Sequence, residues 1–431
     1  MILLLCFCES SLGCGEGSQH VQHGRSSRRH LPRPCESHQS PVGPLLGPPP
    51  NTGLKSSVDM GKGGDASVVH KKAAQRVPVE KPAFTVGTLR KAIPPHCFER
   101  SLLRSSAYLG LDLLAVATLY FVSTFFDQPA VPRWLAYGLL WPAYWFFQGA
   151  VGTGVWVIAH ECGHQAFSKW QAVNDAVGLV LHSCLLVPYY SWKHSHRRHH
   201  SNTGSVDKDE VFVPTLKEAD EFSIENTAPV RLLYIIITLT LGWPMYLVAN
   251  VSGRPYDRWA NHFDPYSPIF SKRERAEVAV SDLALVAVMG GLYSLAQSFG
   301  WLWLLKAYII PYLIVNHWLV LITLLQHTHP DLPHYNSQEW DWLRGALATV
   351  DRSYGFLDVL FHHIADTHVT HHLFSTMPHY HAEEASKAIK PILGKYYKQD
   401  RRNVFVALWK DWDVCRVVSP DQAGHNVLWF Q

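Results

Sequence analysis

Eight histidines fall into three clusters whose residue type and spacing suit metal binding. The clusters occupy residues 160–164 (HECGH), 196–200 (HRRHH) and 368–372 (HVTHH). On a helix, offsets of three and four residues place the histidines of each cluster on one face, and neutral imidazole binds iron, copper, zinc or nickel. A catalytic zinc ion takes about three protein ligands, so eight histidines predict two metal ions. The candidate catalytic and metal-ligating residues are His160, His164, His196, His199, His200, His368, His371 and His372.

The composition narrows the class of protein that carries these clusters. Of the 431 residues, 47% are hydrophobic and only 17% are charged, which is typical of a membrane protein. The formal net charge of +3 is too small to favour a nucleic-acid-binding protein. The eight cysteines form neither a visible disulfide framework nor a CxxC metal motif.

Long apolar stretches flank the first two clusters. Residues 108–126 are about long enough to cross a bilayer, and 134–159 exceed the roughly 20 residues that a crossing needs. The end of the longer stretch, which leads into the first cluster, should therefore leave the lipid. Residues 172–192 are apolar but contain His182 and Pro188. Because a crossing there would put the first two clusters on opposite faces, we expect this stretch to lie in the interface or to dip in and return.

Three more apolar stretches precede the third cluster, at 232–251, 281–299 and 301–325. An even number of them must span if the third cluster is to rejoin the others. The positive-inside rule keeps the basic loop between the first two in the cytosol, which favours 232–251 as re-entrant, broken at 242–244, and the last two as a hairpin. The fold class predicted is an all-α integral membrane protein with about four transmembrane helices, interfacial or re-entrant helices and a cytosolic cap that carries the histidine site.

The chain divides into four parts by composition. Residues 1–59 lack a core-forming pattern, and we expect a disordered extension or a misassigned start there. Residues 60–106 read as a cytosolic segment, 107–397 as the membrane domain and 398–431 as a cytosolic tail. The aromatic tip of that tail (VLWFQ) predicts a short buried or interfacial anchor.

Metal sites at the ends of membrane helices suit chemistry on a lipid-soluble substrate. An unactivated alkyl chain offers no bond that a zinc hydroxide can attack, whereas iron with dioxygen can remove a hydrogen atom. Iron is therefore the expected metal. A histidine-rich metal transporter is the alternative from another class, but its ligands should lie near the bilayer midplane on broken helices. A metal-dependent lipid-binding protein would be a third class.

Three strings carry a resemblance to a known family: HECGHQAFS at 160–168, VPYYSWKHSHRRHHSNTGSVDKDEVFVP at 187–214 and DTHVTHHLFSTMPHYH at 366–381. They closely resemble the microsomal delta-12 oleate (omega-6) desaturases of plants and green algae, over about residues 60–397. The resemblance implies an endoplasmic-reticulum enzyme with a di-iron centre and a cytosolic catalytic face. It also implies that oleoyl chains on phospholipid become linoleoyl chains, with O2 as cosubstrate and electrons from cytochrome b5 and its reductase.

The resemblance also assigns roles to residues. It makes the eight cluster histidines iron ligands, and related acyl-CoA desaturases use a ninth histidine from the helix before the third cluster. We expect His327 to be that ligand, with His329 as the second choice, and His317 to be a buried polar residue. Ligating imidazoles donate their other N–H to an acceptor. Candidate acceptors are Glu161, Asp207, Asp209 and Asp366.

Two positions depart from the family pattern. Gln165 stands where plant members commonly have a further histidine, and Thr370 occupies a position that varies among relatives with altered products. The product is therefore open between the delta-12 alkene and the outcomes of an omega-3 desaturase, or of an oleate hydroxylase, acetylenase or epoxygenase on the same scaffold.

Overall fold

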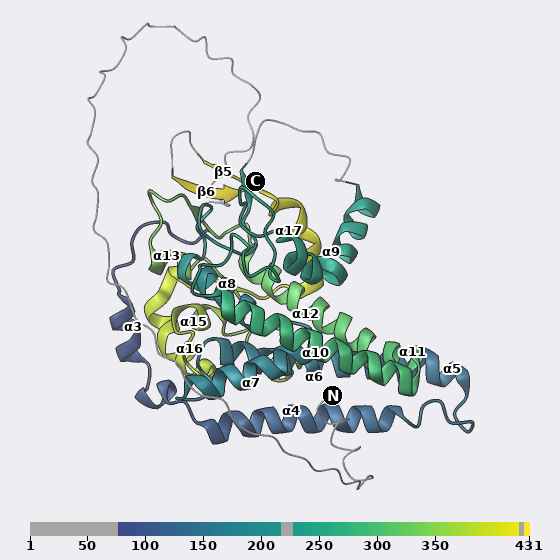
Figure 1. The fold of residues 1–431 in the computed structure, drawn as a ribbon. Helices are drawn as coiled ribbons and strands as arrows, with labels where there is room; N and C mark the ends of the chain where they lie inside the picture. Colours follow the sequence, from purple (N-terminus) through teal and green to yellow (C-terminus); the bar gives the residue numbers. More distant parts are fainter. Residues whose placement is uncertain (1–75, 217–226, 422–425) are drawn as a thin grey trace, which may run out of the picture.

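Most of the described residues belong to α-helices. The computed structural model describes residues 76–216, 227–421 and 426–431 (Figure 1), so the predicted extension 1–59 lies outside the described residues. Within these ranges, four helices are long and apolar enough to cross a membrane. They are α4 (Leu102–Ser123), α9 (Ala228–Ala249), α10 (Arg275–Phe299) and Trp301–His327, which joins α11 (Trp301–Leu304), a π-helical turn (Leu305–Ile309) and α12 (Ile310–His327). The prediction of an all-α membrane protein with about four spanning helices is confirmed.

The identity of the four helices differs from the prediction in one member. Helix α9 is continuous and contains Pro244, so the break predicted at 242–244 is wrong. Proline is tolerated inside membrane helices because neighbouring groups satisfy the freed backbone carbonyl. Conversely, helix α6 (Trp141–Gly163), expected to span from the stretch 134–159, is not among the four. Its Trp and Tyr residues, its glycines and Gln148 keep its mean hydropathy below that of the four.

Helix α6 forms the centre of the protein instead. It follows the short helix α5 (Arg133–Leu135) and a π-helical turn (Ala136–Leu140), and it packs against α4, α12 and α7 (Gln171–Cys184). Two glycines permit the approach of α12, because a Cβ on Gly149 would lie 2.3 Å from Ile314 Cγ2 and one on Gly152 would lie 2.9 Å from Val315 Cγ2. The last turns of α6, with the first histidine cluster, are thereby held inside the fold rather than at its surface.

A sharp bend returns the chain to the end of α6. Helices α7 and α8 (Tyr189–Asn202) meet at an angle of 108° across the turn between them. Leu186 in this turn adopts a positive φ of 54°. The bend brings the second histidine cluster, on α8, beside the first, which is the arrangement expected if 172–192 does not simply cross the membrane.

A cap of short elements covers this end of the helices (Figure 1). The N-terminal elements of the cap, α3 and η1, pack on α16, and α16 packs on α15, which carries the third histidine cluster. The helical elements of the cap are α3 (Val86–Ala92), the 3-10 helix η1 (Pro95–Phe98), α13 (Trp342–Ala346), α14 (Leu357–Leu360), α15 (His368–Leu373), α16 (His379–Leu393), the 3-10 turn η5 (Gly394–Tyr396) and α17 (Val404–Val414).

Two small sheets tie the C-terminal residues into the cap. The first has the order β1-β5-β6-β2, with β5 and β6 antiparallel and Val418 opposite Phe430; in the second, β3 and β4 run parallel. The strands are β1 (Thr215–Leu216), β2 (His334–Tyr335), β3 (Asp351–Arg352), β4 (Gln399–Asp400), β5 (Val417–Pro420) and β6 (Val427–Phe430). Trp429 and Phe430 are buried. The aromatic tip is therefore a buried anchor.

Candidate metal centre

Four helices bring nine imidazoles of the described chain together where α6 ends. Helix α6 supplies the first cluster, α8 the second and α15 the third, and the ninth ring, His327, is the last residue of α12. The structure thus gathers all eight histidines singled out in the sequence, together with the predicted ninth. They separate into two groups that do not follow the three clusters of the sequence.

The first group contains five histidines, each with one ring nitrogen within 4.8 Å of the others. The Nε2 atoms of His160 and His196 lie 2.8 Å apart, and the Nε2 atoms of His164 and His200 lie 3.1 Å from those of His160 and His196, respectively. His371, from the third cluster, completes the group, and its ring centroid lies 4.7 Å from that of His160.

The second group is built around His327. Its Nε2 lies 3.3 Å from His199 Nε2 and 3.1 Å from His368 Nε2, and His372 Nε2 lies 3.1 Å from His368 Nε2. His199, His327 and His372 satisfy the same 4.8 Å criterion as the first group. His327 therefore lies where the sequence predicts a ninth ligand.

Both groups have the chemistry of metal sites. Burial holds the pKa of His200, His371 and His372 well below its usual range, so these rings are neutral and can donate a lone pair. The Nε2 of His371 is buried and has no hydrogen-bond partner among the described residues. A neutral imidazole carries one N–H, so nitrogens that point at one another cannot all be paired by hydrogen bonds. A cation between them would give each lone pair a partner. The donor set, imidazole nitrogen throughout, fits iron, zinc or copper.

The outer nitrogens of the second group are held by hydrogen bonds. His199 Nδ1–H donates to Asp209 Oδ1 over 2.7 Å, and His368 Nδ1–H donates to the carbonyl of Ile364 over 3.2 Å. Thr203 Oγ1 donates to the carbonyl of His199 and accepts from His372 Nδ1–H over 3.2 Å. These bonds direct Nε2 towards the centre of the group. Thr203 was missed in the sequence, although it lies one turn after His199.

Of the four acids proposed as acceptors, only Asp209 contacts a cluster histidine. Glu161 accepts from the backbone N–H of His379, and Asp207 accepts from Ser337. Asp366 accepts from His363, which belongs to neither group. Those three assignments are wrong because each carboxylate finds a nearer donor.

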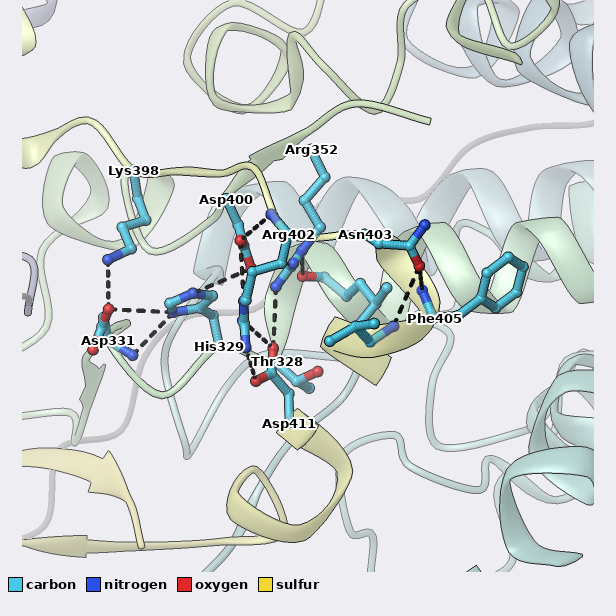
Figure 2. A network of polar contacts seen from close by, with 12 residues as sticks. Thr328, His329, Asp331, Arg352, Lys398, Asp400, Arg402, Asn403, Phe405 and Asp411 are labelled. Carbon is cyan, nitrogen blue, oxygen red and sulfur yellow. Dashed lines mark hydrogen bonds and ion pairs between the residues drawn. The ribbon is translucent and has the colours of Figure 1, made fainter. Parts of the chain in front are cut away.

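His329 lies outside the histidine groups, in a network of charged side chains (Figure 2). Its Nε2 lies 3.6 Å from Asp400 Oδ2 and its Nδ1 lies 3.9 Å from Asp331 Oδ2, so it is held among carboxylates rather than imidazoles. Arg352 bridges Asp400 and Asp411 in the same network. His317 is half-buried within α12, next to the ring of Trp318. Neither residue is part of the histidine groups.

The two positions that depart from the family pattern also lie outside the ligand sets. Gln165 turns away from the metal centre, because its side chain donates to Asp175 and accepts from Asn174 over 3.2 Å and 3.0 Å. A further imidazole is therefore not needed at this position. Thr370 is buried and its hydroxyl lies 2.5 Å from that of Ser386 on α16, so it fixes α15 against α16.

A cavity of about 550 Å³ opens beside the histidines. This volume falls in the range of about 300–1,000 Å³ that is usual for small-molecule sites. Histidines of both groups line it, and its other walls are mainly apolar residues of α6, α9, α12 and α17, among them Trp156, Trp243 and Leu319. The contribution of α9 was missed, because the sequence predicts only a re-entrant segment there and does not show the cavity. An extended apolar molecule in the cavity would pass both groups.

Comparisons with known proteins identify this arrangement. The fatty acid desaturase family model matches residues 139–402. A delta-12 fatty-acid desaturase of Vernicia fordii is 56% identical over 86% of this chain and 99% of its own, and an omega-6 fatty acid desaturase, endoplasmic reticulum isozyme 2, of Glycine max is 55% identical over the same shares. An oleoyl-12-hydroxylase of Ricinus communis is 53% identical over 83% of this chain and 93% of its own. The chain belongs to the fatty acid desaturase family of membrane oxidoreductases.

Proposed function

We propose that the nine histidines hold two iron ions. Five ligands would come from the group around His160 and four from the group around His327, and the buried imidazole nitrogens support this assignment. When bound, the iron pair would supply the oxygen chemistry that removes hydrogen from an unactivated chain. The protein's own residues would position the ligands through Asp209 and Thr203 and exclude water with the apolar cavity walls.

We further propose that the enzyme is a delta-12 acyl-lipid desaturase that converts oleoyl chains to linoleoyl chains with O2. The observation that carries this proposal is the cavity, because its walls are mainly apolar and it is bordered by His160 and His196 of one group and His199, His327 and His368 of the other. A transporter is disfavoured, since the ligands lie at the ends of α6 and α12 rather than in their middle. The names of the relatives from Vernicia fordii and Glycine max support the position of the double bond.

Expression in a yeast that lacks polyunsaturated fatty acids tests the product. We expect a new 18:2 acid with double bonds at carbons 9 and 12, measured by gas chromatography of total fatty acids. A dominant hydroxy acid would favour the second candidate, a hydroxylase, which the relative from Ricinus communis brings into consideration. Conversion of supplied linoleate alone would instead indicate an omega-3 desaturase and contradict the proposal.

The cellular setting is proposed from the same relationships. The four apolar helices associate the protein with membranes, and the relative from Glycine max is named as an endoplasmic-reticulum isozyme. We propose that the protein resides in that membrane with its cap in the cytosol. It would receive electrons there from cytochrome b5 and its reductase and act on oleoyl chains of phospholipid.

Replacing Asp209 with asparagine should lower desaturation and iron content together. An amide accepts the His199 N–H less strongly than a carboxylate, and loss of such an orienting partner typically costs about 10 to 100-fold. Iron per chain and 18:2 formation would both be measured. Asp207→Asn is the matched control, because Asp207 contacts Ser337 rather than a histidine; equal losses in both variants would contradict the orienting role.

A further inference from the structure

A second cluster of metal-ligand side chains lies in the cap, apart from the nine histidines. His96 and Cys97 come from η1, and His381 and Glu384 come from α16. One ligand atom of each lies within 4.8 Å of the other three. His96 Nε2 lies 2.8 Å from Glu384 Oε2 and 3.7 Å from Cys97 Sγ. Four residues from two distant parts of the chain thus converge on one point.

The donor types and spacing suit a zinc ion. Zinc binds four ligands in a tetrahedron with bonds of about 2.0–2.3 Å, which places the ligand atoms roughly 3.3–3.8 Å apart. Of the two separations from His96 Nε2, the one to Cys97 Sγ already has such a value and the one to Glu384 Oε2 would need to lengthen by about half an ångström. A Cys97 thiolate and the Glu384 carboxylate would balance the two positive charges, and the two imidazoles would complete the shell. We propose that these four residues form a structural zinc site.

An ordinary ion pair explains only part of this cluster. The side chains of His96 and Glu384 are 52% and 50% exposed, so their contact alone would contribute little to stability. It gives no reason for a buried cysteine and a second imidazole to face the same point. A zinc ion gives all four groups a partner. The remaining described clusters of this kind either belong to the nine histidines or, as with His363, Asp366 and Glu383, lack a thiolate.

The zinc would fasten the N-terminal segment to the part of the cap that supports the metal centre. Helix α16 packs on α15, which carries His368, His371 and His372, and also on α3 and η1. The site would act as a clip between the chain before the first membrane helix and the chain after the last one. It has no direct contact with the cavity, so its function would be to hold the cap in place.

Metal analysis of the full-length protein, purified in detergent and incubated with zinc, tests the proposal. Because the nine histidines also suit zinc, the expected result is a difference: the unchanged protein should hold about one more zinc ion per chain than His96→Asn or Glu384→Gln, in which the zinc affinity of this site should fall at least tenfold. Both residues are half-exposed, so these variants should fold. Glu383→Gln, the neighbouring exposed acid on α16, is the matched control and should keep its zinc. Iron is measured in the same samples, and its content should change little, which separates this site from the di-iron proposal.

Cobalt provides a second readout for the buried ligand. Co²⁺ bound in the site should show a thiolate-to-cobalt charge-transfer band in the protein with Cys97, and the band should be absent in Cys97→Ser. Retention of zinc in both His96→Asn and Glu384→Gln, or a cobalt complex without the thiolate band in the unchanged protein, would overturn the proposal.

Discussion

Replacing His371 with alanine should lower desaturation at least about 100-fold, since the loss of a ligand exceeds the roughly 10 to 100-fold effect of an outer partner. His371 is the only described member of the first group that α15 supplies, and its ring centroid lies 4.7 Å from that of His160 and 4.8 Å from those of His164 and His200. Formation of 18:2 acid and iron per chain should both fall, while the protein stays in the membrane. His327→Ala should lower 18:2 formation and iron content in the same way, because it removes a ligand of the second group.

His363→Ala is the control for these variants. His363 lies five residues before the third cluster and is half-buried, but its partner is Asp366 rather than another cluster ring. It should retain most of the activity. Substantial activity in His371→Ala would refute the five-histidine group, and substantial activity in His327→Ala would place the ninth ligand elsewhere.

Replacing Arg352 with methionine should destabilise the protein by about 3–5 kcal/mol, the cost of leaving a buried charge without its partner. Arg352 is 1% exposed; it bonds Asp400 and Asp411 and donates to the carbonyl of Leu325 over 2.8 Å (Figure 2). Without it, two buried carboxylates keep only Arg402, whose side chain is partly exposed, as their common cation. Thermal and denaturant unfolding in detergent would measure the loss.

The pH dependence of that loss follows from the pKa of Asp400. Hydrogen bonds from His329 and Arg402 and the charge of Arg352 hold this pKa well below its usual range. A lowered pKa in the folded state contributes stability above the ordinary carboxyl pKa of about 3.9, and this contribution is lost as the pH falls below it. The free energy of unfolding of Arg352→Met should therefore differ most from that of the unchanged protein near neutral pH.

Arg402→Met is the control for burial. The side chain of Arg402 is 34% exposed, so this variant should lose less unfolding free energy than Arg352→Met. An equal loss would contradict the importance of burial.

The sequence predicted which histidines come together but not how they divide into two groups. Histidines four residues apart share a group, as His160 and His164 do, whereas His199 and His371 leave their own cluster for the opposite group. Each residue of a helix is turned by about 100° from the last, so residues i and i+4 are about 40° apart, whereas residue i+3 is turned about 60° to the other side of residue i. A histidine at i+3 therefore lies at the edge of the shared face and can join a different group. Tertiary packing decides which helix lies on that side, and the spacing of histidines in the sequence alone does not reveal it.

The assignment of apolar stretches failed for a related reason. The lengths of the apolar stretches correctly predicted α4, α10 and α12 as candidate spans. They also predicted that α6 spans and that α9 is broken, which differs from the structure. The glycines and aromatic residues of α6 serve contacts with other helices rather than with lipid. Pro244 predicts a break in isolation, yet α9, which packs on α12, continues through it. Contacts between distant segments decide both cases.

The division of the histidines between helices also dictates when the enzyme can be completed during its synthesis. The group around His160 requires His371, and the group around His327 requires His372. Neither is finished until α15 has left the ribosome, after all four apolar helices have been made. Iron would therefore bind late. Both groups would become complete at almost the same point of translation, when the few residues of α15 have been added. A chain that stops before α15 would be inserted in the membrane with neither site complete.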